Sequence, residues 1–337
     1  MSHPATFTAY GFTEKGGELQ KLSLPWTEPT DGHVVLKVKA CGVCAGDDVP
    51  RLQLIPTPFP RVPGHEFVGE IVAVPESEKD YKLGQIVGGG WHGGQCNSCA
   101  NCKVGKFIGC SAHYIHGVRS DGAYAEYVTV RKEALVPVPE GMAPEHAGPL
   151  LCAGITVFNS LRNVDIRAGD LVAVNGIGGL GHLAIQFASK MGYRVVALSS
   201  GSSKREDCLK LGAFAYLDGS QVDQAAELQK LGGAKVIMLC APTSNVAPLL
   251  KGLAYDGTLL VLAAGHEPTP IPLFMLVPNR TTIRGWPSGS AQDSADCLNF
   301  AHHFGIKPLV QLFPLDKAAD AFKARSTARY RAVIVPN

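Results

Sequence analysis

Residues 171–192 of the chain read LVAVNGIGGLGHLAIQFASKMG, and this stretch decides the fold. Its first five residues are those of an apolar, buried strand, whereas residues 180–192 place apolar side chains at helical spacing. Between them, residues 176–181 match the pattern G-x-G-x-x-G. A glycine pattern alone is a weak signal, because glycine-rich turns are common. The strand before it and the helix after it are the context that a dinucleotide-binding fold requires, so we predict that fold here.

Each glycine of the motif has an expected task. Gly176 permits the tight turn, Gly178 lets the backbone approach a pyrophosphate, and Gly181 lets the helix pack closely on the strand. The start of the helix offers free N–H groups to the phosphates. The predicted cofactor-binding residues of the motif are Gly176, Gly178, Gly179, Leu180 and Gly181.

The pattern of the chain changes near residue 150. Before it, sequence rich in Gly and Pro separates short β-branched runs such as 33–40 and 66–74, which is an all-β pattern. After it, strand-like segments such as 194–200 and 235–241 alternate with helix-like ones, which predicts βαβ units and a parallel sheet. The predicted fold class is α/β, with a β-rich domain followed by a doubly wound, parallel-sheet Rossmann domain.

The segment after the second strand of this sheet selects the cofactor. An NAD site usually has Asp or Glu there to bind the ribose hydroxyls, but residues 199–205 read SSGSSKR and contain no carboxylate. Hydroxyl groups and two cations suit a 2′-phosphate, because charge-assisted hydrogen bonds to phosphate are strong. The alternative is a serine-rich loop before an ordinary basic helix start, which would oppose the helix dipole. We therefore expect NADP(H) rather than NAD(H), bound by Ser199, Ser200 and Lys204.

Four of the ten cysteines lie close together, with the spacing C-x2-C-x2-C-x7-C. Four thiolates can close a tetrahedral shell around zinc and leave no position for a substrate. The alternatives are four unrelated buried cysteines or an iron–sulfur cluster of unusual spacing. We expect a structural zinc bound by Cys96, Cys99, Cys102 and Cys110, with catalysis elsewhere.

Further motifs, in a fixed order, give the chain a family resemblance. They are CGVC (41–44), GHE (64–66), the cysteine lobe after GWHGG (90–94), LLCAGIT (150–156), GIGGLG (176–181) and YRAV (330–333). With them, the chain resembles the zinc-containing medium-chain alcohol dehydrogenases, especially the cinnamyl-alcohol-dehydrogenase-like branch, over essentially its whole length. The resemblance implies a GroES-like, zinc-binding catalytic domain of residues 1–149 and 288–337 and a dinucleotide-binding Rossmann domain of residues 150–287.

The resemblance also implies a second zinc in each chain and the residues around it. It places Cys44, His65 and Cys152 as ligands of a catalytic zinc, the Cys, His, Cys set of alcohol dehydrogenase, with Glu66 as a transient fourth ligand. It implies that Asp47 accepts a hydrogen bond from the His65 ring and that Arg331 lies near the cofactor phosphates. The residues that it places at the substrate pocket are Gly46, Trp91, His92 and Trp286, the last three having surface or core packing as the alternative role.

Gly46 departs from the family pattern. The family has Ser or Thr two residues after the first zinc ligand, and that hydroxyl begins the proton relay. We expect reversible, NADP(H)-dependent oxidation of an alcohol to an aldehyde or ketone, with a water in the space left at Gly46 and more room for a bulky substrate. One alternative is an NADPH-dependent reductase of an activated C=C or C=N bond in specialised metabolism, where no alkoxide needs a proton. Another is a non-enzymatic nucleotide-binding sensor.

Composition and charge narrow the partners and the location. Hydrophobic residues make up 46% of the chain and the net charge is +2, so we expect a folded protein that binds neither nucleic acid nor a membrane. No apolar run approaches the roughly 20 residues of a membrane helix, and the N-terminus lacks a signal-peptide pattern, so the expected location is cytoplasmic. The expected partners are a small-molecule alcohol or carbonyl substrate and, by family analogy, a second copy of the chain bound through residues 273–285.

Overall fold

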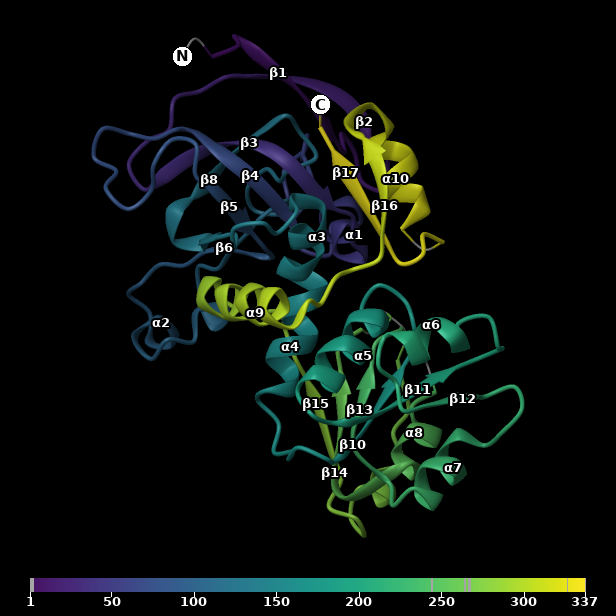
Figure 1. Ribbon diagram of the computed structural model, residues 1–337. Helices are drawn as coiled ribbons and strands as arrows, with labels where there is room; N and C mark the ends of the chain where they lie inside the picture. The colour runs from purple at the N-terminus through teal and green to yellow at the C-terminus, as the bar shows by residue number, and fades with distance from the viewer. Residues whose placement is uncertain (1–2, 244, 264, 266–267, 326, 337) are drawn as a thin grey trace. The chain divides into compact units, whose positions relative to one another are not determined.

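The computed structural model describes residues 3–243, 245–263, 265, 268–325 and 327–336, and the chain divides into two compact units (Figure 1). The first unit comprises Met1–Ile155, Gly289–His303 and Lys307–Asn337. The second comprises Thr156–Ser288 and Phe304–Ile306. In sequence, the second unit is therefore an insertion into the first.

The first unit is built mainly from antiparallel strands. Its largest sheet has the order β16-β17-β3-β4-β5-β9, with β8 also paired to β3, and of these pairs only β16 with β17 is parallel. Two smaller sheets pair β1 with β2 and β6 with β7. The strands are β1 (Thr6–Gly11), β2 (Gln20–Pro25), β3 (His33–Gly42), β4 (Phe67–Ala73), β5 (Ile86–Gly89), β6 (His92–Gly94), β7 (Tyr114–Ile115), β8 (Tyr127–Arg131), β9 (Leu135–Pro137), β16 (Val310–Pro314) and β17 (Arg331–Val335). The helices are α1 (Asp48–Arg51), α2 (Ala100–Lys103), α3 (Pro144–Pro149), α9 (Ala291–Phe304), whose last residue falls in the second unit, and α10 (Ala318–Ala324).

Strand β3 is the centre of this unit. It pairs with β4, β8 and β17, so most of its side chains are buried. Leu36 and Val38 of β3 share a hydrophobic core with Phe67 and Ile71 of β4 and with Tyr124. Burial of such large apolar side chains contributes roughly 1.5–3 kcal/mol each to folding. The loop that follows β3 and the loop that precedes β4 therefore leave from one rigid strand pair.

The second unit contains a six-stranded, fully parallel sheet. Its order is β12-β11-β10-β13-β14-β15, which is the 3-2-1-4-5-6 order of a dinucleotide-binding fold. The strands are β10 (Leu171–Asn175), β11 (Arg194–Ser199), β12 (Ala215–Asp218), β13 (Ala234–Leu239), β14 (Leu253–Val261) and β15 (Thr282–Gly285), and the helices are α4 (Ile155–Leu161), which begins one residue before this unit, α5 (Gly181–Lys190), α6 (Arg205–Lys210), α7 (Gln224–Lys230) and α8 (Ala247–Lys251). The predicted α/β fold class, a β-rich part with a doubly wound parallel-sheet part, is confirmed.

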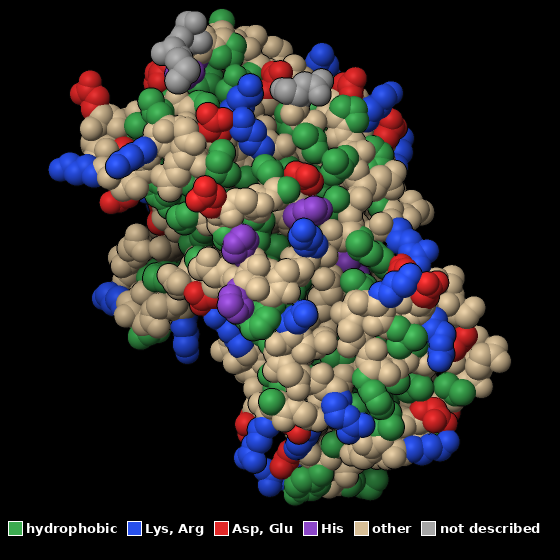
Figure 2. Space-filling model, in the orientation of Figure 1, with side chains coloured by type: hydrophobic (Ala, Val, Ile, Leu, Met, Phe, Trp, Pro, Cys, Tyr) green, Lys and Arg blue, Asp and Glu red, His purple; other side chains and the backbone are tan. Residues whose placement is uncertain are grey.

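The surface carries charges of both signs. On the face drawn in Figure 2, Lys and Arg side chains are interspersed with Asp and Glu, in keeping with the small net charge. Within the described ranges of the chain, no helix has the length and apolar character needed to cross a membrane.

Candidate active site and metal centres

Four side chains from three segments of the first unit converge on one point. Cys44 follows β3, His65 and Glu66 immediately precede β4, and Cys152 lies in the helical turn Leu150–Gly154. One donor atom from each lies within 4.8 Å of all the others. The Cys44 and Cys152 Sγ atoms are 3.9 Å apart, and Cys152 Sγ is 3.5 Å from His65 Nε2. The structure therefore brings together residues separated by up to 108 positions in the sequence.

The spacing of these donors fits zinc. Tetrahedral zinc, with bonds of about 2.3 Å to sulfur and about 2.0–2.1 Å to nitrogen, places two sulfur ligands about 3.8 Å apart and a sulfur and a nitrogen ligand about 3.6 Å apart. The observed separations of 3.9 Å and 3.5 Å agree with these values. Two thiols and one imidazole make three ligands, which leaves the fourth position for Glu66 or for a substrate.

The two thiols differ in how readily they ionise. A hydrogen bond from the Cys152 thiol, together with the positive charge of His65, lowers the pKa of Cys44 well below its usual value despite burial. The pKa of Cys152 is raised, because it donates to Cys44 and is buried. Burial disfavours the charged His65 ring, but the Asp47 carboxylate and the Cys44 thiolate outweigh this and raise the pKa of His65. Cys44 is therefore the first of the two thiols to ionise.

Glu66 is fully buried and paired with Arg331. The Arg331 Nη2 group donates to both Glu66 carboxylate oxygens. Burial nevertheless raises the pKa of Glu66 to about 7, because Arg331 offsets only part of the desolvation. A Cβ atom on Gly42 would lie 2.1 Å from Glu66 Oε2, which explains the glycine in the CGVC motif. The observed contact of Arg331 is thus with the ligand cluster, and its contact with cofactor phosphates stays a prediction.

Asp47 accepts four hydrogen bonds around the cluster. Its Oδ1 atom lies 3.1 Å from both His65 Nδ1 and the Gly64 amide nitrogen. Its Oδ2 atom accepts from the Cys44 amide at 2.9 Å and from the Tyr124 hydroxyl at 2.8 Å. A carboxylate beside Nδ1 keeps a proton on that nitrogen, so Nε2 is the nitrogen whose lone pair is free for a metal when the ring is neutral. Sequence reasoning missed Tyr124, because a tyrosine in a β-rich run carries no signal of its distant partner.

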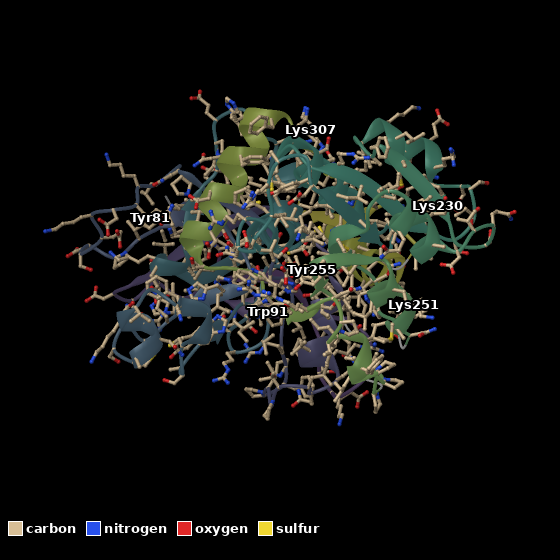
Figure 3. The ribbon with its side chains drawn as sticks, turned by 90° about the horizontal axis from the view of Figure 1, so that it is seen from below. Tyr81, Trp91, Lys230, Lys251, Tyr255 and Lys307 are labelled. Atoms are coloured by element: carbon tan, nitrogen blue, oxygen red, sulfur yellow. The ribbon has the colours of Figure 1, made fainter. Side chains whose placement is uncertain are left out.

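The place of a side chain at Gly46 is already filled. A Cβ atom there would lie 2.8 Å from His65 Cε1 and 3.2 Å from Trp91 Cζ3. Trp91, labelled in Figure 3, meets the His65 ring edge to face, with ring centres 4.8 Å apart. The expectation that Gly46 leaves room for a water or a bulkier substrate in place of its missing side chain is therefore wrong. Trp91 and His65 pack over that position instead.

His92 is held in a buried hydrogen-bonded chain. Its Nδ1 atom lies 2.9 Å from His113 Nε2, and its Nε2 atom lies 2.7 Å from Gln95 Oε1. Gln95 in turn donates to Asn97 Oδ1 at 3.0 Å, within the cysteine lobe. Burial lowers the pKa of His92 and lowers that of His113 to about 4. Both ring nitrogens of His92 are thus engaged in linking β6 to the lobe.

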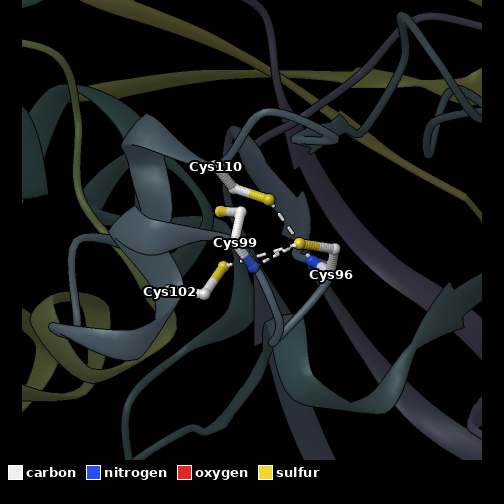
Figure 4. Close-up of side chains that lie close together, drawn as sticks. All are labelled: Cys96, Cys99, Cys102 and Cys110. Carbon is white, nitrogen blue, oxygen red and sulfur yellow. Dashed lines mark hydrogen bonds between the residues drawn. The ribbon is translucent and has the colours of Figure 1, made fainter.

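The four lobe cysteines form a second cluster (Figure 4). Their donor atoms also lie within 4.8 Å of one another, and Cys96 Sγ is 4.0 Å from Cys102 Sγ, close to the roughly 3.8 Å of a zinc–thiolate site. Backbone N–H groups donate to the sulfurs of Cys96 and Cys110. Hydrogen bonds from Ser98 and from the Cys99 amide lower the pKa of Cys96 to about 5. Four converging thiols with amide support fit a closed zinc shell that admits no substrate.

The glycine motif of the second unit has the geometry of a nucleotide turn. Gly176 has φ +87°, and a Cβ atom there would lie 2.4 Å from Ala241 Cβ. A Cβ atom on Gly181 would lie 2.1 Å from the Gly176 carbonyl oxygen, so helix α5 starts in close contact with the turn. A Cβ atom on Gly178 would meet nothing within 4 Å. The backbone at Gly178 therefore faces open space where a pyrophosphate would approach.

The loop after β11 contains a cation and also lies beside a carboxylate. Lys204 Nζ donates to the Ile177 carbonyl oxygen in the glycine turn at 2.6 Å. Asp218, the register partner of Ser199 on β12, accepts from the Gly201 amide at 2.8 Å. The same Asp218 oxygen accepts from the Ser220 amide and hydroxyl. Sequence reasoning missed this carboxylate, because only the parallel register of β11 and β12 brings it beside the loop.

Trp286 lies in the second unit, directly after β15. Its amide donates to the Val261 carbonyl oxygen at 3.2 Å, and the Arg284 guanidinium lies 4.7 Å from the centre of its ring. These contacts fix Trp286 at the carboxyl ends of β14 and β15. That edge of a parallel sheet is where ligands bind in doubly wound folds.

Comparison with known proteins agrees with both units. The family model "Alcohol dehydrogenase GroES-like domain" matches residues 30–140, and "Zinc-binding dehydrogenase" matches residues 179–303. The chain is 44% identical over 336 residues to the alcohol dehydrogenase patD of Penicillium expansum, with 98% of each protein covered. It is 42% identical over 341 residues to the alcohol dehydrogenase notN of Aspergillus sp. (strain MF297-2), with 99% of each covered. The solved structure of the cinnamyl alcohol dehydrogenase SbCAD4 from Sorghum bicolor has a TM-score of 0.88 and 29% identity, covering 98% of this chain and 97% of that one.

The chain belongs to the zinc-containing medium-chain alcohol dehydrogenase family. The predicted family is therefore confirmed, as is the GroES-like nature of the β-rich part. Membership identifies the protein as an oxidoreductase of the alcohol–carbonyl class, in a family that uses zinc and a nicotinamide cofactor.

Proposed function

We propose that the protein is a zinc-dependent, NADP(H)-dependent oxidoreductase that interconverts an alcohol and an aldehyde or ketone by hydride transfer. The observation that carries the proposal is the buried Cys44, His65 and Cys152 set, whose donor spacing fits zinc with one position left open. The test is NADP+-dependent oxidation of primary and secondary alcohols, measured with zinc-loaded protein and with a Cys152→Ser variant. Loss of activity together with loss of one zinc per chain is expected, and full activity in the variant would contradict the proposal.

The residues of the chain prepare the site for this reaction. Cys44, His65 and Cys152 would hold the zinc, which, when bound, polarises the substrate oxygen and lowers the pKa of its hydroxyl while the nicotinamide exchanges the hydride. Asp47 fixes the His65 ring through Nδ1. The Trp91 ring covers one side of His65 and so restricts access of water to it. Preorganised ligands of this kind pay no reorganisation cost during the reaction.

The proton relay is altered in this proposal. Position 46 offers no hydroxyl, and Trp91 and His65 leave no room for one. The hydroxyl proton therefore leaves by another route than the family's side-chain relay. The solvent isotope effect on alcohol oxidation tests this, since a rate limited by proton release is expected to fall in D2O. An isotope effect near one at every pH would contradict an impaired relay.

The cofactor proposal rests on the loop after β11. Ser199, Ser200 and Lys204 offer two hydroxyls and a cation, and the nearby Asp218 oxygen is used within the loop. Hydrogen bonds to charged groups are each worth about 1.5–3 kcal/mol, so Lys204→Ala is expected to weaken NADPH binding by roughly 10- to 100-fold. NADH, which lacks the 2′-phosphate, serves as the matched control ligand. Equal loss for both dinucleotides, or tighter binding of NADH by the unaltered protein, would contradict the NADP(H) assignment.

A second candidate reaction is favoured by the same Gly46 geometry. An NADPH-dependent reductase of an activated C=C or C=N bond needs no hydroxyl relay to an alkoxide, and position 46 has neither the hydroxyl nor the space for one. NADPH consumption with cinnamaldehyde-type aldehydes, compared with conjugated enones and cyclic imines, separates the two reactions. Product analysis identifies the bond that is reduced. A preference for enones or imines by more than tenfold in kcat/KM would replace the leading proposal.

We also propose that two copies of the chain associate through the edge of the parallel sheet. Strand β15 is paired on one side only among the described strands, and residues just before it are strongly exposed, with Leu273, Phe274 and Val277 at 72%, 81% and 72%. Exposed apolar patches of this kind are typical of interaction surfaces. Light scattering is expected to give twice the mass of one chain, and Phe274→Asp is expected to give single chains. A monomeric wild-type protein would contradict this.

The proposed location is the cytoplasm. All ten cysteines, each among the described residues, are free thiols. Six of them belong to the two donor clusters, and the other four, Cys41, Cys208, Cys240 and Cys297, are buried. Reduced thiols persist in reducing compartments, where disulfides are rare. Fractionation of cells that express the tagged chain tests the location, and recovery in the secreted fraction would contradict it.

A further inference from the structure

Tyr124 is a buried polar residue that the proposed reaction does not use. Its side chain is fully buried and is the largest in the core of the first unit. Its hydroxyl donates to Asp47 Oδ2 at 2.8 Å. A buried hydroxyl must be paired to avoid the cost of desolvation, and here the partner is the carboxylate that orients a zinc ligand.

The four donors to Asp47 come from different places in the chain. Cys44 contributes its amide, and the adjacent residues Gly64 and His65 contribute an amide and the Nδ1 group. All three belong to the two segments that carry the ligands Cys44 and His65. Tyr124 comes from a third segment, three residues before β8, so it ties the carboxylate to a part of the fold that carries no ligand.

Tyr124 also packs on the backbone beside His65. Gly64 has φ +106°, and a Cβ atom there would lie 2.6 Å from Tyr124 Cδ1. The Tyr124 amide donates to the Pro63 carbonyl oxygen at 3.1 Å, and its own carbonyl accepts from the Tyr10 amide at 2.7 Å. The ring thus fixes the chain before His65, while the hydroxyl fixes the carboxylate that bonds to the His65 ring.

The direction of the hydroxyl bond is set by its surroundings. Burial, with the nearby Asp47 charge, raises the pKa of Tyr124 well above its usual value, so the phenol keeps its proton and donates. Without this hydroxyl, Asp47 Oδ2 would retain only the bond from the Cys44 amide. The carboxylate would then be held by three donors in place of four, and the bond to His65 Nδ1 would be less firmly fixed.

We propose that Tyr124 is a positioning residue of the catalytic zinc centre, which holds Asp47 so that His65 Nε2 stays aimed at the metal. The inference rests on the proposed zinc-binding function of Cys44, His65 and Cys152. Loss of a group that directly orients a metal ligand typically costs 10- to 100-fold in metal affinity. Since Tyr124 acts one step further out, Tyr124→Phe is expected to speed zinc release from this centre by about three- to tenfold.

The experiment follows zinc release to a colorimetric chelator, 4-(2-pyridylazo)resorcinol, from the purified protein at pH 7. Two phases are expected, and a Cys152→Ser variant, which retains the cysteine lobe, identifies the phase that comes from the lobe. Tyr124→Phe is compared with Tyr127→Phe, because Tyr127 lies three residues on and packs on Phe7 and Trp26 away from Asp47. In cobalt-substituted protein, the thiolate-to-cobalt absorption of the catalytic centre is expected to shift in Tyr124→Phe only.

The possible outcomes distinguish a failure of the positioning role of Tyr124 from a failure of the proposed zinc-binding function. A faster catalytic-site phase in Tyr124→Phe, with an unchanged lobe phase and an unchanged Tyr127→Phe control, supports the positioning role. An unchanged or slower phase overturns it, and so does equal acceleration of both phases, which would indicate general loosening of the fold. A wild-type protein with a lobe phase alone would overturn the proposed zinc centre itself, and the positioning role with it.

Discussion

Adding a side chain at Gly46 is a direct test of how the active site is packed. An ideally placed Cβ would lie 2.8 Å from His65 Cε1, 3.2 Å from His65 Nε2 and 3.2 Å from Trp91 Cζ3. His65 is tied to Asp47, so relief of this clash must disturb the His65–Asp47 bond, the packing of Trp91 or both. Overpacking of this kind typically costs about 1–3 kcal/mol. Gly46→Ala is therefore expected to destabilise the protein by about that amount.

The same clash predicts that a restored hydroxyl does not help. Gly46→Ser alone is expected to lower kcat/KM for alcohol oxidation, by about tenfold if 1.4 kcal/mol of the strain falls on the transition state. In a Trp91→Ala background, Gly46→Ser is expected to be better tolerated, because the contact with Trp91 Cζ3 is gone and only the contact with the His65 ring remains. The coupling energy of Gly46→Ala with Trp91→Ala should then be about 1–2 kcal/mol in favour of the double variant.

The assay combines thermal unfolding, zinc content and kcat/KM with NADP+ for the four members of the cycle. Gly46→Ala is the matched control for Gly46→Ser, since it adds the Cβ without the hydroxyl. A Gly46→Ala protein as stable as the wild type, or a coupling energy near zero, would refute the packing argument. A single Gly46→Ser variant with raised alcohol oxidation would show that the missing hydroxyl alone limits the reaction.

Three further predictions concern stability. Cys99→Ser should lower the midpoint of thermal unfolding and remove the lobe zinc, while each folded molecule keeps its turnover. A variant that loses turnover at full stability would contradict a purely structural role for the lobe zinc. Arg331→Met should destabilise the protein by about 3–5 kcal/mol, because it leaves the Glu66 carboxylate buried without its partner. Adding Glu66→Gln should recover part of the lost stability. An Arg331→Met protein as stable as the wild type would contradict the pairing. Burial lowers the pKa of His116 to about 4 from the usual 6.5, so between these values the unfolded state binds more protons and stability falls as pH falls. His116→Phe should make urea unfolding less dependent on pH between about 4 and 6.5, and an unchanged dependence would count against a buried neutral ring.

Features encoded locally could be predicted from the sequence. The glycine turn lies between one strand and one helix, and the observed φ of Gly176 and the close approach at Gly181 follow from that local pattern. The cysteine lobe is equally local, because its four thiols lie in one short loop. The parallel sheet could be predicted because its strands alternate regularly with helices.

Features that depend on distant contacts could not be predicted in this way. The Cys44 and Cys152 thiols are 108 residues apart, and only the family resemblance suggested that they meet. Tyr124 and Asp47 are 77 residues apart, and neither residue type specifies the other. The packing of Trp91 over Gly46 is a matter of ring placement, so the sequence suggested free space where the structure has none.

The central claim is that the chain has two zinc centres and that the reaction belongs to the one formed by Cys44, His65 and Cys152. Its most direct test is zinc per chain, measured by mass spectrometry of metals in the wild type and in Cys152→Ser. About two zinc ions are expected in the wild type and about one in the variant, with alcohol oxidation lost and the fold retained. A wild-type protein with a single zinc that Cys152→Ser leaves in place would contradict the claim.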